Sequence, residues 1–145
     1  MWKRLKKSFT ALRWRAYREA LSRRQSGIRT MSLYSEQRPW GSFHVIDEGE
    51  GFKVKRLVVT QGGRLSLQSH KHRYEHWTVV SGIATVTVDD QVLNLNRGAA
   101  IDIPLGAKHR LENLHHGNVE IIEVQFGDYL GEDDIIRYQD IYART

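Results

Sequence analysis

Residues 64–88 read RLSLQSHKHRYEHWTVVSGIATVTV, and their pattern decides the class of fold. Apolar and polar side chains alternate, or β-branched side chains cluster, as they do in strands. Gly82 interrupts the pattern where a turn is expected. The same kind of run recurs, set off by glycine or aspartate pairs, at residues 52–60, 92–96, 99–103 and 119–126. Many short strands with no helical segment between them predict an all-β sandwich or barrel.

The charge of the chain is unevenly distributed. The 145 residues carry a formal net charge of +5 at pH 7. Residues 1–30 hold ten of the 22 Lys and Arg and one acidic residue, whereas residues 31–145 hold twelve basic and sixteen acidic residues. The body of the chain is therefore mildly acidic, and its basic character belongs to an N-terminal extension. We expect no nucleic-acid partner.

The extension has the period of an amphipathic helix. In residues 1–24, apolar side chains recur at steps of three and four with Arg and Lys between them. This pattern favours a basic helix with weak contact to a membrane surface. Two alternatives stay open: a solvated tail, or translation that begins at Met31.

Cysteine is absent, which excludes disulfide bonds and thiolate metal sites and fits a reducing compartment. No run of 18 apolar residues is present, so a spanning helix is excluded. The N-terminus lacks the apolar core of a secretory signal. We expect a cytoplasmic protein.

One face of the stretch from 64 to 72 is unusually polar. If this stretch is extended, alternate side chains share a face. That face carries Arg64, Ser66, Gln68, His70 and His72. On the next strand, Glu75 and Trp77 share a face and His76 opposes them. A polar face is a poor core, so it either meets water or lines a polar cavity.

Residues 98–113, GAAIDIPLGAKHRLEN, place Gly98, Pro104, Gly106, His109 and Asn113 at fixed intervals. The spacing matches the second motif of the cupin superfamily, Gly-x5-Pro-x-Gly-x2-His-x3-Asn, at every position. The chain therefore resembles a cupin, a double-stranded β-helix or jelly-roll barrel.

The first cupin motif, Gly-x5-His-x-His-x3-4-Glu-x6-Gly, also has a counterpart. Taking both histidines of HKH as the pair leaves too few residues before the glutamate. The spacing fits throughout when Gln68 takes the first histidine position, with Gly62, His70, Glu75 and Gly82 in the others.

The resemblance implies one divalent metal ion held by Gln68, His70, Glu75 and His109. The amide oxygen of glutamine would replace one imidazole nitrogen. Such a set of two nitrogen and two oxygen ligands suits Zn, Mn, Fe, Co or Ni, and the sequence does not choose among them.

A narrower resemblance covers residues 38–144. It rests on long matching stretches: RPWGSF (38–43), RLSLQSHKHRYEHW (64–77), IPLGAKHRLEN (103–113) and IIEVQFGDYLGEDDI (121–135). These are similar to the C-terminal cupin of type II mannose-6-phosphate isomerases, which is usually fused to a mannose-1-phosphate guanylyltransferase domain. No Gly-rich nucleotide loop of such a domain is found in this sequence. The resemblance implies a metal-dependent isomerase that interconverts mannose 6-phosphate and fructose 6-phosphate.

Further residues are candidates for the reaction. His72 and Glu123 are candidate bases. The alternative for His72 is a polar residue at the strand end or one that contacts a metal ligand, and the alternative for Glu123 is a buried, hydrogen-bonded structural acid or one that contacts a metal ligand. Arg64, Lys108 and Arg110 are candidate substrate contacts, because arginine and lysine suit phosphate; solvated surface charges are the alternative.

We expect a small-molecule sugar phosphate as ligand and a homodimer as the assembly. Two rival functions stay open: a non-catalytic cupin that binds a sugar phosphate or nucleotide sugar as a sensor, and a different metal-dependent cupin enzyme.

Overall fold

The computed structural model describes residues 33–143, which belong to a compact unit spanning Ser32–Thr145. The N-terminal extension, with its predicted helix and membrane contact, lies outside the described residues. The strands are β1 (Tyr34–Arg38), β2 (Gly41–Gly49), β3 (Phe52–Val59), β4 (Leu67–Ser69), β5 (Arg73–Ser81), β6 (Ile83–Val88), β7 (Gln91–Asn96), β8 (Ala100–Ile103), β9 (His109–Glu112), β10 (Val119–Gly127) and β11 (Ile136–Gln139).

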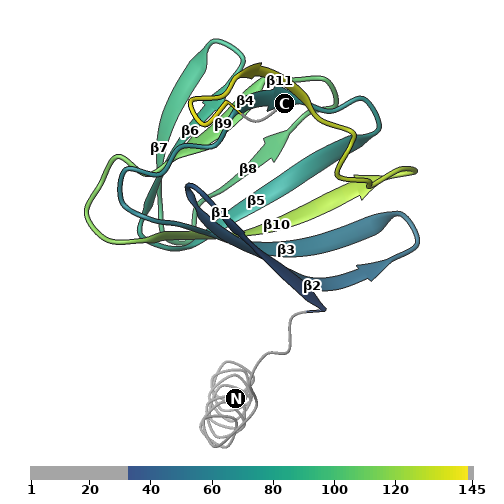
Figure 1. The fold of residues 1–145 in the computed structure, drawn as a ribbon, viewed down its shortest axis with the longest axis horizontal. Coiled ribbons are helices and arrows are strands. Elements are labelled where there is room, and N and C mark those ends of the chain that lie inside the picture. Colours follow the sequence, from purple (N-terminus) through teal and green to yellow (C-terminus); the bar gives the residue numbers. More distant parts are fainter. Residues whose placement is uncertain (1–32, 144–145) are drawn as a thin grey trace, which may run out of the picture. The chain divides into compact units, whose positions relative to one another are not determined.

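These strands form two sheets. The larger has the order β1-β2-β3-β10-β5-β8 and the smaller the order β11-β4-β9-β6-β7. Every pair of neighbouring strands is antiparallel. Figure 1 shows the larger sheet facing the smaller one, so that the inner faces of both enclose the core. The predicted all-β fold is confirmed, and residues 33–143 contain no helix long and apolar enough to cross a membrane.

Alternation along the strands builds the core. The long strand β10 buries every second residue, and so does β5 beside it. The register places Ile121 of β10 beside Val79 of β5, and Val119 beside Val59 of β3. At one end of the barrel the inward side chains are apolar: Val59, Val79, Ala84, Val86, Leu111, Val119 and Ile121.

Two residues of the sequence motifs hold turns in place. Asn113 is fully buried, and its amide donates to the carbonyls of Val59 and Gly117 at 2.9 and 2.7 Å. Gly41 of RPWGSF has a φ of 143°, and a Cβ there would collide with the carbonyl oxygen of Val58. Glycine is therefore needed where the β1–β2 hairpin crosses β3 closely.

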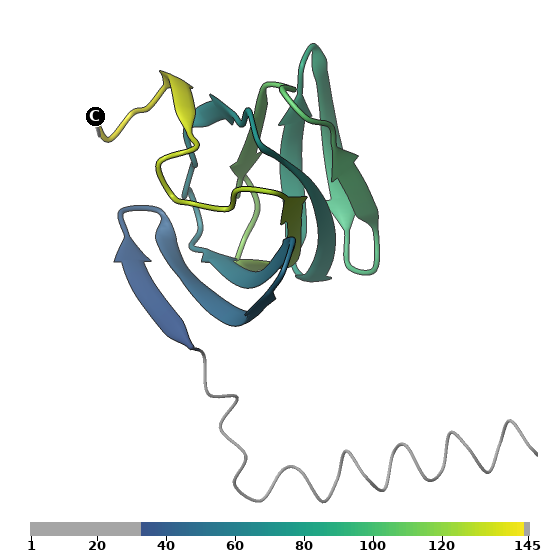
Figure 2. The ribbon, with the colours of Figure 1, turned by 90° about the vertical axis from the view of Figure 1, so that its right-hand side faces the viewer.

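The strand predicted over residues 64–70 is shorter in the structure. Only Leu67–Ser69 pair as β4, and the chain bends at residues 71–72 before β5 begins. The segment between β10 and β11, residues 128–135, contacts this bend, and we call it the closing loop. Figure 2 shows it crossing the open end of the barrel.

Candidate metal centre and cavity

Three side chains from separate parts of the chain meet between the sheets. His70 follows β4, Glu75 lies in β5 and His109 opens β9, and each is at most 2% exposed. His70 Nε2 lies 3.1 Å from Glu75 Oε1, and His109 Nε2 lies 3.7 Å from Glu75 Oε2. One ligand atom from each residue lies within 4.8 Å of the other two. The group is compatible with a metal site.

Backbone carbonyls orient both imidazole rings. His70 Nδ1 lies 2.6 Å from the carbonyl oxygen of Asp134, and His109 Nδ1 lies 2.9 Å from that of Ala107. Because a carbonyl oxygen only accepts, each Nδ1 carries a hydrogen and donates it. The Nε2 atoms are then the ones that face Glu75. Metal-binding histidines are commonly oriented in this way.

The electrostatics of the group favour a cation. Burial raises the pKa of Glu75, but the hydrogen bond with His70 and the basic side chains beside the carboxylate, Arg73 among them, lower it to about 2. Burial lowers the pKa of His109, so its ring is neutral near pH 7. Its Nε2 is buried and has no hydrogen-bond partner within residues 33–143. A lone pair and an ionised carboxylate thus face each other, and the donors present fit a divalent metal ion.

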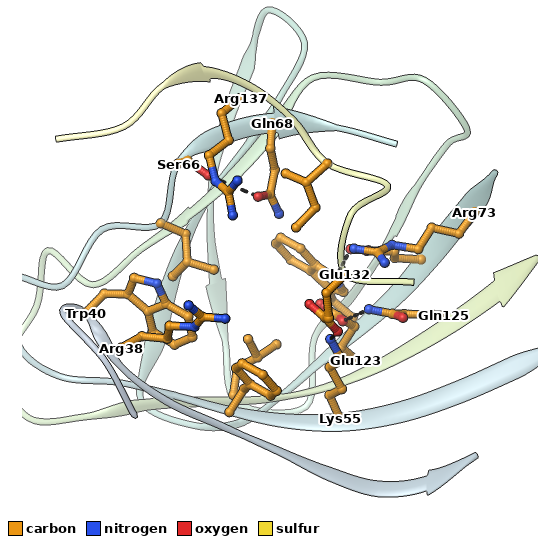
Figure 3. Close-up of a pocket in the computed structure, with 16 residues that line it drawn as sticks. Arg38, Trp40, Lys55, Ser66, Gln68, Arg73, Glu123, Gln125, Glu132 and Arg137 are labelled. Atoms are coloured by element: carbon orange, nitrogen blue, oxygen red, sulfur yellow. Dashed lines mark hydrogen bonds and ion pairs between the residues drawn. The ribbon is translucent and has the colours of Figure 1, made fainter. Parts of the chain in front are cut away.

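Gln68 lies in β4 directly opposite His109 of β9. Figure 3 shows its amide pointing into the cavity that Glu75 also lines. The hydroxyl of Ser66 donates to Gln68 Oε1 at 3.0 Å, which orients the amide and leaves a second lone pair on that oxygen. Gln68 as the fourth ligand stays a prediction that this placement supports.

Two further buried side chains fix the carboxylate of Glu75. Arg73 Nε donates to Oε1 at 3.0 Å, and Trp77 Nε1 donates to Oε2 at 2.9 Å. Arg73 also places Nη2 3.4 Å from His70 Nε2 and donates through Nη1 to the carbonyl of Gly131 at 3.4 Å. The carboxylate is therefore held in one orientation by groups outside the histidine pair.

A cavity that is partly open to solvent borders this group. Glu123 and Gln125 of β10 line it, as their alternation with apolar residues predicts, and so do Lys55 and Glu132 (Figure 3). Gln125 Nε2 donates to Glu123 Oε1 at 2.5 Å. Lys55 forms an ion pair with Glu132.

Glu123 has the properties of a group that exchanges protons near neutral pH. It is 6% exposed. Burial and the nearby charge of Glu75 raise its pKa to about 7, although the positive charges of Lys55 and Arg73 act in the opposite direction. A carboxyl with such a pKa in a cavity is a candidate general base.

The prediction that the side chain of His72 lies on the same strand face as Gln68 and His70 is wrong. The side chain of His72 is 52% exposed, does not line the cavity, and lies 3.9 Å from Asp128. Asp134 causes the difference, because its carboxylate accepts the backbone N–H groups of Lys71 and His72 at 3.0 Å each and so bends the chain after β4. These hydrogen bonds lower the pKa of Asp134 against the effect of burial.

The three predicted substrate contacts also lie off the cavity. Arg64 Nε pairs with Glu112 Oε1 at 2.9 Å, and Arg110 Nε lies 3.4 Å from the other oxygen of that carboxylate. Lys108 is exposed and stacks over the ring of Tyr138. None of the three lines the cavity that borders Glu75. Their role in substrate binding stays a prediction without support from this geometry.

Two cavity residues that the motifs do not single out carry a signal in the sequence. Lys55 alternates with the buried Leu57 and Val59 along β3, and Arg73 alternates with Glu75 along β5. In both strands the period of two places the basic residue on the inner face. The buried environment of Lys55 and Arg73 could therefore have been predicted.

Other cavity residues come from chain segments that no local period connects. Arg38 and Trp40 belong to RPWGSF, Glu132 to the closing loop and Arg137 to β11, and all four line the cavity. RPWGSF and the stretch from 121 to 135, which both carry the narrower resemblance, thus contribute to one cavity.

Two antiparallel sheets with a buried histidine–glutamate group between them define the chain as a cupin. The fold is similar to that of an RmlC-like cupin from Shewanella frigidimarina, with a TM-score of 0.63 and 17% identity over 74% of this chain and 92% of that one. It is also similar to the capsular polysaccharide assembling protein CapF from Staphylococcus aureus, with a TM-score of 0.61 and 19% identity over 74% of this chain and 34% of that one.

Within the cupins, the chain belongs to the family described as Mannose-6-phosphate isomerase C-terminal, which it matches over residues 28–140. It is 49% identical to the xanthan biosynthesis protein XanB of Xanthomonas campestris, over 88% of this chain and 28% of that protein. It is 54% identical to the alginate biosynthesis protein AlgA of Pseudomonas aeruginosa, over 74% of this chain and 22% of that protein. The mannose-1-phosphate guanylyltransferase of Escherichia coli is 49% identical over 74% of this chain and 23% of its own length. The chain thus spans about a quarter of these relatives.

Proposed function

We propose that the chain is a metal-dependent aldose–ketose isomerase that interconverts mannose 6-phosphate and fructose 6-phosphate. The observation that carries the proposal is the buried group of His70, Glu75 and His109 in a chain of the mannose-6-phosphate isomerase C-terminal family. The reaction moves one proton from C2 of the aldose to C1 and a second from the C2 hydroxyl to the oxygen on C1, and it needs no oxidant. A phosphorylated sugar as substrate also favours a cytoplasmic location.

The metal would be held by His70 Nε2, His109 Nε2, the carboxylate of Glu75 and the amide oxygen of Gln68. When bound, it supplies Lewis-acid stabilisation of the negative charge that develops on the two sugar oxygens. Arg73 and Trp77 keep the Glu75 carboxylate in position through their hydrogen bonds.

Glu123 is the residue that we expect to move the proton. Its Oε1 is held by Gln125, so Oε2 is the atom that accepts and returns the proton. With a pKa raised to about 7, the carboxylate and the acid are both populated near neutral pH. Transfer from one carbon to the next needs both forms in turn. The buried Lys55 beside it stabilises the ionised form.

Turnover of mannose 6-phosphate by the purified chain tests the proposal, with Zn²⁺, Mn²⁺ or Co²⁺ added and metal content measured in the same sample. Replacement of a direct ligand, Glu75→Gln, should weaken metal binding by roughly 100-fold or more and abolish turnover. Glu123→Gln should keep the metal but lower kcat by roughly 10²- to 10⁴-fold.

His76→Gln is the matched control, because His76 is adjacent to Glu75 but points outward and contacts Asp102 at 2.6 Å. This variant should bind metal and turn over as the unmodified chain does. Absence of turnover in a fully metal-loaded sample would refute the isomerase. Saturable binding of mannose 6-phosphate without turnover would instead identify a sugar-phosphate-binding cupin.

A further inference from the structure

The basic side chains of the cavity fall into an inner and an outer pair. The inner pair, Lys55 and Arg73, is buried, and each already forms an ion pair with a glutamate. The outer pair, Arg38 and Arg137, is partly or fully exposed but lines the same cavity. Of these four side chains, therefore, only those of the outer pair can form an ion pair with a ligand without breaking a buried contact.

Arg137 is placed at the cavity by β11. The register sets it opposite Gln68 of β4, and Figure 3 shows its guanidinium extending past Gln68 into the cavity. Within residues 33–143 it has no hydrogen-bond or ion-pair partner. A guanidinium offers five donors and no acceptor, so in this position it is suited to an anion.

Arg38 ends β1 on the other sheet. Its guanidinium lies 5.5 Å from the centroid of the Phe43 ring, and Figure 3 shows it directed into the cavity beside Trp40. Its Nη2 lies 2.8 Å from Glu36 Oε1, and both side chains are about 30% exposed, at 28% and 33%. Because the pair is partly exposed, solvent screens part of its attraction. A ligand with two negative charges can therefore compete with Glu36 for Arg38.

Acceptors and donors are unevenly distributed through the cavity. The buried part has the carboxylate of Glu123 and the Oε1 of Gln125, which has no hydrogen-bond partner within residues 33–143. Carboxylate and amide oxygens accept hydrogen bonds from sugar hydroxyls. The outer part has Arg38, which is paired with Glu36, and Arg137. Guanidinium groups are suited to bidentate contact with phosphate. This distribution matches a molecule with hydroxyls at one end and a phosphate at the other.

We propose that Arg38 and Arg137 form a phosphate-binding subsite at the outer end of the cavity. The inference rests on the proposed function in that it names the part of the same cavity that distinguishes a sugar phosphate from a free sugar. The subsite fixes the direction of the ligand, with the phosphate at the two arginines and the carbonyl carbon toward His70, Glu75 and His109. Neither arginine takes part in proton transfer.

Calorimetric binding of mannose 6-phosphate and of unphosphorylated mannose tests the subsite independently of turnover. Arg137→Gln and Arg38→Gln should each weaken binding of mannose 6-phosphate by about tenfold or more and leave binding of mannose unchanged. Arg137→Lys keeps the charge but not the paired donors, so it should recover part of the loss. In a turnover assay, KM should rise while kcat is largely retained.

Two further variants sharpen the result. Glu36→Gln removes the competitor for Arg38 and should tighten binding of mannose 6-phosphate, which is the opposite direction. Arg97→Gln changes an exposed arginine that does not line the cavity and should leave both affinities unchanged. Since all of the arginines tested are partly or fully exposed, the melting temperatures of the arginine variants should match that of the unmodified chain.

Equal loss of mannose and mannose 6-phosphate, or no loss in either arginine variant, would overturn the subsite. Turnover that persists with unchanged KM in both variants removes the subsite and leaves the isomerase intact. If the chain shows no turnover but binds mannose 6-phosphate or inorganic phosphate in a way that depends on the two arginines, the subsite is supported and the isomerase is refuted.

Discussion

The two ends of the barrel interior are built by the same strands and differ in character. Along β10, the inward residues Val119 and Ile121 are followed by Glu123 and Gln125, and all four are buried. Along β5, β3 and β9 the inward residues likewise change from apolar to polar toward the open end. The period of two never breaks; only the chemistry of the inward side chains changes.

This difference separates stability from chemistry within one core. Burial of apolar groups at the closed end is favourable without any geometric precision. At the open end, each buried polar group must find a partner, and ion pairs there tend to offset their own desolvation at best. We therefore expect substitutions at the closed end to change the free energy of unfolding, and substitutions at the open end to change pH dependence and metal affinity.

The largest expected effect on stability is at the closed end. Ile121→Ala removes most of a side chain that is 1% exposed and should lower the free energy of unfolding by about 3 kcal/mol. Urea titration measures the loss. Ile141→Ala, at a residue 61% exposed, is the control and should change it by less than about 0.5 kcal/mol. If both variants lost a similar amount of unfolding free energy, the closed end would not be the stabilising core that we infer.

The next effect is at the open end and depends on pH. Because the pKa of Glu123 is raised to about 7, the folded chain holds a proton there that the unfolded chain releases above its ordinary pKa of 4.5. The stability that Glu123 contributes is thus present at low pH and is lost as pH rises, by about 2 kcal/mol between pH 5 and 7.

The measurement compares unfolding of the metal-free chain and of Glu123→Gln across this range. The difference between the two curves isolates Glu123, since His109, with its lowered pKa, changes stability in the opposite direction. Glu120→Gln, at an outward residue of the same strand that pairs with Arg56, should retain the decline. A difference curve that stays flat between pH 5 and 7 would show that Glu123 is already ionised.

The smallest effect concerns the closing loop. Asp134→Asn leaves one oxygen for the two backbone N–H groups of Lys71 and His72, so the bend that carries His70 should loosen. Zinc affinity should fall about tenfold, as it does when outer groups that orient metal ligands are changed. Competition with a chelating dye measures it. Asp128→Asn, in the same loop at a side chain 88% exposed, should have no effect, and an equal fall there would refute the role of Asp134.

Much of the fold follows from the sequence because short-period alternation is a local property. It locates β3, β5, β6, β7, β8 and β10 within a few residues and places Glu123 and Gln125 on the inner face. Motif spacing adds what alternation cannot, since it brings His109 together with His70 and Glu75 from a distant part of the chain.

The features of the fold and cavity that the sequence does not predict depend on contacts between distant segments. The prediction of one continuous strand from residue 64 to 72 is wrong at its end. Asp134, more than 60 residues away, accepts hydrogen bonds from two backbone N–H groups there, and His72 therefore points outward. The outer wall of the cavity likewise joins Arg38 and Arg137, from two different sheets. No periodicity in either segment indicates that they will meet.

The indole of Trp77 has a further consequence. It donates to the carboxylate that lies between the two histidines, and its ring meets that of His109 edge to face at a centroid separation of 5.6 Å. Whatever alters the charge or hydrogen bonding of that carboxylate also alters the immediate surroundings of an intrinsic fluorophore. The fold therefore contains a label-free optical reporter within contact distance of the proposed metal ligands Glu75 and His109.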